Sequence, residues 1–262
     1  MDTLNVAISG ISGSGKSNLS GRLLTTALPN AVLIGGDKHK YETIGEIFAD
    51  RPLIKRQWRD HELLGDDGRE NSMVLAADVD AYKALMDVVD PIVAQKMLAE
   101  IEQAKANGKQ FCIMEYYAMK RLAPALNQAD IFIEVMAKCD QTRFQKLLQR
   151  HNAAEEVENI QDPVKRELYA HLLKQHGLET VKQLYDQRDQ AFSMTDLDWQ
   201  RWRNHVERNV NLRVHNQYCE QEFDQWAEHL GWIIKKYGQI KMTNKDAFKL
   251  EEWRKFQDRE NA

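Results

Sequence analysis

One segment near the start of the chain restricts the possible folds more than any other. A short apolar run, Leu4–Ile8, is followed by a glycine-rich turn, and residues 18–27 then carry leucines at helical spacing. The turn consists of Gly10, Ile11, Ser12, Gly13, Ser14, Gly15, Lys16 and Ser17. It matches the G-x-x-x-x-G-K-[ST] pattern at each specified position, and it lies between a predicted strand and a predicted helix. The sequence therefore predicts a phosphate-binding loop, or P-loop.

Each part of such a loop has a chemical task. Glycines allow the backbone to wrap so that amide N–H groups converge on phosphate oxygens, and the following helix adds its positive end. Lys16 is expected to reach the β- and γ-phosphates, and the Ser17 hydroxyl is expected to bind Mg²⁺. We therefore expect ATP and Mg²⁺ as cofactors. The alternative is a glycine-rich turn that precedes a helix by chance.

Further apolar runs indicate how a sheet could be built around this loop. They cover residues 31–34, 111–114, 131–135 and, more weakly, 212–215. Long stretches with helical character separate them, which is the alternation typical of a parallel sheet. We therefore predict an α/β protein with three layers, in which helices cover both faces of a five-stranded parallel sheet.

The character of the sequence divides the chain into three parts. Residues 1–139 and 210–238 contain the predicted strands and are expected to form the nucleotide-binding core. Residues 140–209 are polar and helix-favouring, which predicts a helical lid or insertion. Residues 239–262 are strongly charged but keep Phe248 and Trp253. That pattern predicts a final amphipathic helix packed on the core or on a partner.

Two acidic residues follow predicted strands, at the sheet edge where ligands bind in open α/β folds. Asp37 comes after the run at 31–34, and its carboxylate could accept a proton from an acceptor hydroxyl during phosphoryl transfer. It could instead cap a helix that begins near Lys38. Glu115 ends the run at 111–114 and could orient Mg²⁺ through water. Its alternative is a solvated residue at a strand end.

Basic residues provide further candidates. Arg143 and Arg150 are seven residues apart, so on a helix they share one face and could close over a triphosphate. We expect Arg143 to bind the nucleotide and Arg150 to stabilise charge in the transition state, against the alternative of a solvated helix face. Lys38, His39 and Lys40 form a basic cluster that could meet a phosphate-bearing acceptor or form a solvated turn.

Composition excludes several classes of function. The net charge is −4, from 36 basic and 40 acidic residues, which gives no general attraction to nucleic acid. No segment approaches the ~20 apolar residues of a membrane span. The three cysteines lack metal-ligand spacing and suggest no disulfide framework, which favours a reducing cytoplasm. The expected partner is a small-molecule phosphoryl acceptor, and a homo-oligomer stays open.

The chain resembles the P-loop small-molecule kinases, and most closely the dephospho-coenzyme A kinase family. The resemblance rests on the P-loop, on Asp37 and Glu115, and on the stretches Asp67–Arg69 and Asp90–Val93. Asp140–His151 resembles the entry to that family's lid. The resemblance implies the three-layer P-loop kinase fold and phosphorylation of the ribose 3′-hydroxyl of dephospho-coenzyme A.

The sequence departs from that family on the acceptor side. Gly35-Gly36-Asp37 stands where the family has Asp-Ala-Asp, and Asp90-Pro91 stands where it has His-Pro. An arginine near Ser72 is missing, and the segment between Asn152 and Asn209 is longer than that family's compact lid. Uridine-kinase-like and nicotinamide-riboside-kinase-like enzymes share the loop and the aspartate position, so they are alternatives. A second class of alternative is a non-catalytic protein that senses a nucleotide.

Overall fold

The computed structural model describes residues 3–50, 79–139, 141–143, 145–146, 187, 190–192 and 210–243. Its strands are β1 (Leu4–Ser9), β2 (Ala31–Gly35), β3 (Phe111–Glu115), β4 (Ile131–Ala137) and β5 (Val210–Asn216). Its helices are α1 (Lys16–Arg22), η1 (Leu23–Ala27), α2 (Gly36–Asp50), α5 (Val79–Ala106), η2 (Met119–Leu122), α6 (Ala123–Leu126) and α10 (Glu220–Thr243).

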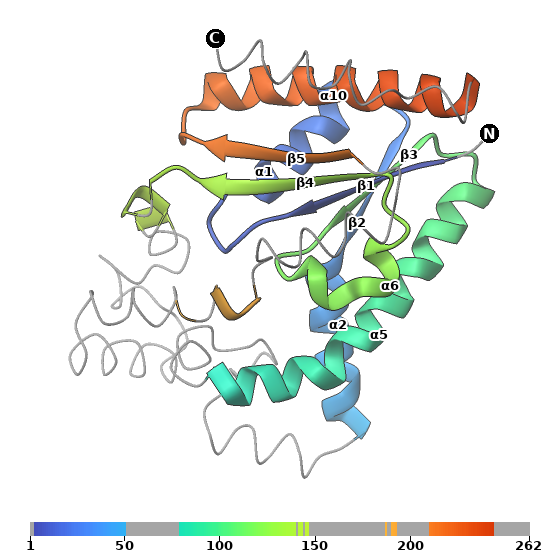
Figure 1. The fold of residues 1–262 in the computed structure, drawn as a ribbon. Helices are drawn as coiled ribbons and strands as arrows, with labels where there is room; N and C mark the ends of the chain where they lie inside the picture. Colours follow the sequence, from blue (N-terminus) through green and yellow to red (C-terminus); the bar gives the residue numbers. More distant parts are fainter. Residues whose placement is uncertain are drawn as a thin grey trace.

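The strands form one parallel sheet in the order β2-β3-β1-β4-β5 (Figure 1). β1 lies between β3 and β4, so the loop that follows it emerges near the middle of the sheet edge. The chain leaves β1 toward β2 on one side and leaves β3 toward β4 on the other. Such a reversal opens a crevice at the carboxyl ends of the strands, where ligands bind in this class of fold.

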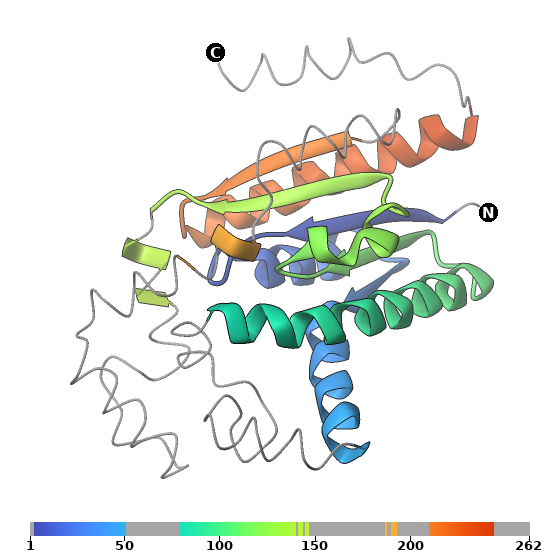
Figure 2. The same cartoon turned by 60° about the horizontal axis from the view of Figure 1, so that its bottom comes forward.

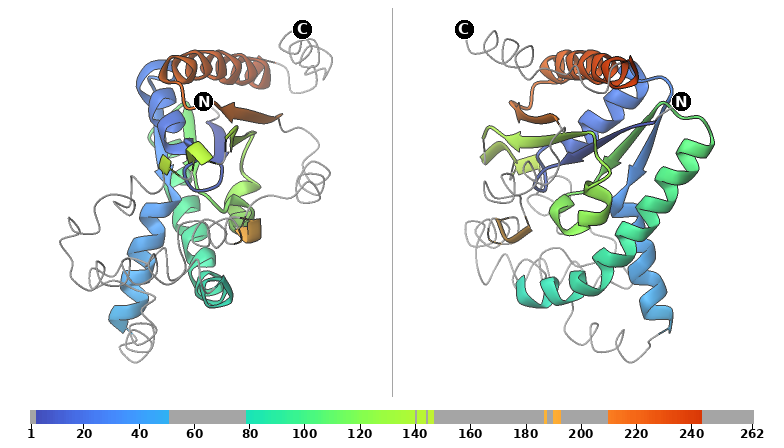
Figure 3. Two further views of the ribbon diagram at one scale, coloured as in Figure 1. Left: turned by 90° about the vertical axis from the view of Figure 1, so that its left-hand side faces the viewer. Right: turned by 45° about the vertical axis from the view of Figure 1, so that its right-hand side comes forward.

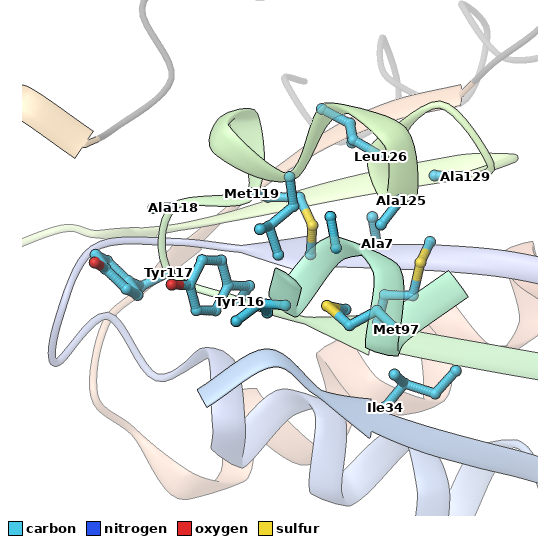
Figure 4. Close-up of a cluster of buried hydrophobic side chains, with 14 of the residues drawn as sticks. Ala7, Ile34, Met97, Tyr116, Tyr117, Ala118, Met119, Ala125, Leu126 and Ala129 are labelled. Carbon is cyan, nitrogen blue, oxygen red and sulfur yellow. The ribbon is translucent and has the colours of Figure 1, made fainter. Parts of the chain in front are cut away.

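Helices cover both faces of the sheet, and alternate residues of each strand serve the two faces. In β1, Val6 and Ile8 pack with α1, η1 and α10, whereas Ala7 packs on the side of α5 and α6. Figure 2 shows α5 and α10 on opposite sides of the sheet, and Figure 4 shows side chains of the α5 side. The predicted three-layer α/β architecture is confirmed, including the weakly indicated strand β5.

Helix α2 leaves the end of β2 and packs against α5 (Figure 3). Lys96 of α5 binds Glu46 of α2 at 2.8 Å, and the His39 imidazole lies 3.3 Å from the Glu100 carboxylate. The helix begins at Gly36, so the alternative that placed Asp37 before a helix starting near Lys38 is wrong. Asp37 lies inside the first turn of α2.

Other predictions meet the structure only in part. Helix α10 runs without a break across the boundary expected between residues 238 and 239. Among the described residues, no helix combines the length and the apolar character that crossing a membrane requires. Arg150, Asp67–Arg69, most of the 140–209 segment and the chain after Thr243 lie outside the described residues.

Candidate nucleotide-binding site

Two glycines of the loop occupy positions that a larger residue could not fill. Gly15 has a φ of 98°, and a Cβ on it would lie 2.5 Å from Asn216 Nδ2. A Cβ on Gly10 would lie 2.4 Å from the carbonyl oxygen of Val135. The loop is therefore pressed against β4 and the end of β5, and glycine is needed for that close approach.

Three side chains from distant parts of the chain hold the loop from outside. Arg143 Nη1 donates to Ser12 O at 3.3 Å, Tyr218 Oη to Gly13 O at 3.2 Å, and Asn216 Nδ2 to Ser14 O at 2.7 Å. Because the carbonyl and N–H of a trans peptide point in opposite directions, the N–H group of Gly13 points away from Arg143 and that of Gly15 points away from Asn216. That orientation is what binding of an anion by backbone amides requires.

Two polar side chains of the loop are buried and have no partner within the described part of the chain. The Ser14 hydroxyl is shielded from solvent and has no hydrogen-bond partner among the described residues. Lys16 is 6% exposed, and no carboxylate of the described chain lies within ion-pair distance of its ammonium. Buried polar groups are normally satisfied, so these two fit the oxygens of a bound phosphate chain.

Glu115 lies beside the loop, at the end of β3. β3 is the direct neighbour of β1, with Glu115 opposite Ile8. One carboxylate oxygen accepts a hydrogen bond from the Ser17 hydroxyl at 2.5 Å, and the other accepts one from the Ser20 hydroxyl. Glu115 is 8% exposed, so the alternative of a solvated strand end is wrong.

The residues around Ser17 suit Mg²⁺ held together with a nucleotide. Nowhere in the described part of the chain do three or more His, Cys, Asp or Glu side chains gather as a metal-binding group. Mg²⁺ usually keeps several waters and takes one or two protein oxygens besides phosphate oxygens. The Ser17 hydroxyl could supply such a ligand, and Glu115 could orient the waters.

Asp37 lies at the same edge of the sheet. Gly35, the last residue of β2, is in register with Glu115, and Asp37 follows in the first turn of α2. Its side chain is 43% exposed, yet its Oδ1 atom is buried. The Lys40 ammonium lies 3.7 Å from Oδ1.

Lys40 and His39 do not form the solvated turn that the sequence left open. They lie on α2 and are only 2% and 4% exposed. The Lys40 ammonium lies 4.6 Å from the centroid of the Tyr41 ring and 5.2 Å from that of Tyr117. Lys38 is exposed and lies 3.9 Å from Glu42 and Glu100.

A buried polar group behind Asp37 was not singled out as functional from the sequence. Asp90 of α5 is 2% exposed, and it accepts hydrogen bonds from the Tyr116 hydroxyl at 2.9 Å and from Arg121. Burial raises the pKa of Asp90, although the hydrogen bond and charge of Arg121 act in the opposite direction. Burial also raises the pKa of Tyr116 well above its ordinary value, so its phenol remains a donor.

A cluster of aromatic rings lies on the Lys40 side of Tyr117. Phe192, from the 140–209 segment, is 1% exposed and lies 4.9 Å from Tyr82 and 6.0 Å from Tyr117, measured between ring centroids. The Arg121 guanidinium lies 5.1 Å from the Phe192 centroid. Tyr116 and Tyr117 follow β3 directly, and their ring centroids lie 4.8 Å apart (Figure 4). Thus a piece of the predicted insertion packs on the core against Tyr117, whose ring also lies 5.2 Å from the Lys40 ammonium.

The structure therefore brings together the predicted loop residues, Glu115 and Arg143. Arg143 is 2% exposed, and it contacts the loop from its carbonyl side. Asn216 and Tyr218 were missed, because their only signal in the sequence was a polar residue at the end of a weak strand. Asp90 entered the sequence analysis only through the family resemblance, as part of a matching stretch and as a departure within it.

Comparisons with known proteins bear on the fold. No model of a known protein family matches this chain. Among solved structures, the chain is similar to TT1252 from Thermus thermophilus, with 16% sequence identity and a TM-score of 0.51. The match covers 90% of this chain and 98% of that one. This likeness shows the fold alone.

Proposed function

We propose that this protein is an ATP- and Mg²⁺-dependent kinase that transfers the γ-phosphoryl group to a hydroxyl of a small molecule. One observation carries the proposal. Asp37, whose carboxylate is half-exposed, comes two residues after Gly35, the last residue of β2. Gly35 is in register with Glu115 of β3, and the Glu115 carboxylate accepts a hydrogen bond from the Ser17 hydroxyl of the P-loop. A metal-orienting pair and a candidate base therefore share one sheet edge, as phosphoryl transfer to a hydroxyl requires.

Each residue has a defined part in this proposal. The N–H groups of Gly13 and Gly15 bind phosphate oxygens, and Lys16 stabilises the negative charge that develops on the transferring group. Ser17 and Glu115 hold and orient the metal. Asp37 accepts the proton of the attacking hydroxyl. Bound Mg²⁺-ATP would supply the transferable phosphoryl group and part of the charge neutralisation.

Dephospho-coenzyme A is our first choice of acceptor, and a nucleoside or riboside is the alternative. Two departures from the dephospho-coenzyme A kinase pattern are connected through Tyr116. A Cβ on Gly36 would lie 2.6 Å from the Tyr116 ring, and the Tyr116 hydroxyl binds Asp90. The acceptor side is thus a coherent local arrangement, which supports the kinase proposal more than a nucleotide sensor with a decayed pocket. The three cysteines are free, which agrees with a cytoplasmic location.

The test is Asp37→Asn, assayed by ADP release with dephospho-coenzyme A, uridine and nicotinamide riboside as acceptors. Asn keeps the shape of the side chain but cannot accept the proton, so we expect kcat to fall by roughly 10²- to 10⁴-fold while ATP affinity is retained. Asp80→Asn is the matched control, because Asp80 also lies in the first turn of a helix and is 95% exposed.

The outcomes separate the alternatives. Turnover of Asp37→Asn close to that of the wild type would remove Asp37 from the catalytic residues. If ATP binds but no acceptor stimulates ADP release by the wild type, the nucleotide-sensing alternative replaces the kinase.

A further inference from the structure

Lys40 is a cation buried beside the candidate base. It lies on α2, three residues after Asp37, and its side chain is 3% exposed. Burying an ammonium group costs several kcal/mol unless negative groups surround it. The partners of Lys40 therefore decide what this residue does.

Groups other than Asp37 fix the position of the ammonium. The rings of Tyr41 and Tyr117 lie 4.6 and 5.2 Å from it, close enough for cation–π attraction. Asp90 is also within electrostatic reach: burial raises the pKa of Asp90, and the charge of Lys40 is one of the influences that oppose this rise. Tyr117 and Asp90 belong to the core behind α2, so Lys40 is anchored to the body of the protein.

The two sides of the Asp37 carboxyl group have different surroundings. Oδ1 is buried, has no hydrogen-bond partner within the described chain, and lies 3.7 Å from the Lys40 ammonium. The side chain as a whole is nevertheless 43% exposed. One oxygen therefore faces inward to a fixed positive charge, and the exposed surface belongs to the rest of the group, including the outer oxygen.

We propose that Lys40 is the positioning residue for Asp37: its anchored ammonium holds the inner carboxylate oxygen so that the outer oxygen faces the acceptor hydroxyl. The attraction is between opposite charges in a poorly solvated place, where it is stronger than at the surface. The role assigned to the outer oxygen rests on the proposed kinase function. The orientation of the carboxyl group does not.

The test is a double-mutant cycle with Lys40→Met and Asp37→Asn. Misplacing a reacting group by about 1 Å can cost 10²-fold in rate, so we expect Lys40→Met to lower kcat by roughly 10- to 100-fold with an unchanged KM for ATP. Lys40→Arg keeps the charge and should recover part of this loss. In the Asp37→Asn background, Lys40→Met should have less than about a twofold further effect, because its target has lost its charge. If the two losses multiply, Lys40 does not act through Asp37 and the proposal is wrong.

The chain offers a matched control pair. Asp80 and Lys83 of α5 have the same spacing and lie 3.5 Å apart, but their side chains are 95% and 45% exposed. Lys83→Met should leave kcat unchanged. Lys40→Gln, which loses the charge but keeps a hydrogen-bond donor, serves if the methionine variant does not fold, and the same loss of kcat is expected for it.

A crystal structure of Lys40→Met separates this proposal from the proposed function. We expect the Asp37 carboxyl group to turn outward, with both oxygens exposed, whether or not the wild type phosphorylates dephospho-coenzyme A, uridine or nicotinamide riboside. An Asp37 side chain that keeps its buried Oδ1 in that variant would overturn the positioning role. Absence of transfer by the wild type to all three acceptors would count against the kinase and leave the crystallographic result to decide on Lys40.

Discussion

Glu115 shows how much one side chain at a strand end can control. Both of its oxygens accept hydrogen bonds from serine hydroxyls, Ser17 and Ser20, whereas the amide of a glutamine would offer only one acceptor oxygen. We expect Glu115→Gln to raise the Mg²⁺ concentration for half-maximal activity by about 10- to 100-fold, the range typical when a residue that orients a metal site is replaced. A Mg²⁺ titration of ADP release measures this shift.

A control and a contrary outcome define that test. Glu102→Gln removes a carboxylate on α5 that is 69% exposed and pairs with Lys105, so its Mg²⁺ dependence should match the wild type. An unchanged Mg²⁺ requirement in Glu115→Gln would mean that this carboxylate only braces the serines. Activity that survives complete chelation of metal would contradict the Mg²⁺ site altogether.

At the residue scale, the site residues that can be predicted from the sequence are those that belong to a local pattern. Lys16 and Ser17 can be predicted from their spacing to the loop glycines, and Glu115 can be predicted from its place at the end of an apolar run. Asn216 and Tyr218 contact the same loop although they lie 202 and 205 positions along the chain from the residues that they bind. Contacts between residues so far apart depend on which strands become neighbours in the sheet. The spacing of apolar residues along the sequence does not contain that information.

At the scale of elements, the connection between β5 and α10 supports the P-loop. Asn216 ends β5, is 3% exposed, donates to the Ser14 carbonyl, and accepts a hydrogen bond from the Tyr218 N–H at 2.6 Å. Asn216→Leu leaves that carbonyl without its donor, at a cost of about 1–3 kcal/mol, or roughly 5- to 150-fold in affinity if the loss falls on the loop conformation that binds nucleotide.

We therefore expect Asn216→Leu to bind ATP more weakly while the protein stays folded, with calorimetric titration as the measurement. Asn127→Leu is the control, since Asn127 is exposed at the end of α6, before β4 begins. An unchanged ATP dissociation constant in Asn216→Leu would show that the glycines alone hold the loop in its binding form.

At the scale of the whole molecule, the order of apolar runs predicted the layers and the five strands, because parallel strands buried on both faces need continuous apolar sequence. The strand order was not predicted, since all the runs look alike in composition. The start of α2 was missed for another reason. Gly35-Gly36 reads as a turn, whereas Gly36 begins α2 and lies so close to the Tyr116 ring that a side chain would not fit. The extent of α10 was hidden by Gly238, which the helix accommodates.

Phe192 connects the 140–209 segment to the rest of the molecule and allows that connection to be tested. It is buried among Tyr82, Tyr117 and the Arg121 guanidinium. Phe192→Ala should lower the free energy of unfolding by about 3–5 kcal/mol, the usual cost of removing a buried phenyl ring. Denaturant unfolding measures this change, and Val88→Ala, at a 50% exposed position on α5, should cost far less.

The same variant tests whether this packing matters to the acceptor side. Tyr117 contacts both Phe192 and the Lys40 ammonium, so loss of the phenyl ring should disturb the surroundings of Asp37 more than those of the P-loop. In protein that is still folded, we expect Phe192→Ala to lower kcat while ATP affinity stays near that of the wild type, and Phe192→Leu, which fills more of the space, to recover part of both losses. If stability falls but kcat does not, Phe192 anchors the segment without any influence on transfer. If ATP affinity falls instead, the segment acts through Arg143 and the loop carbonyls rather than through the aromatic cluster.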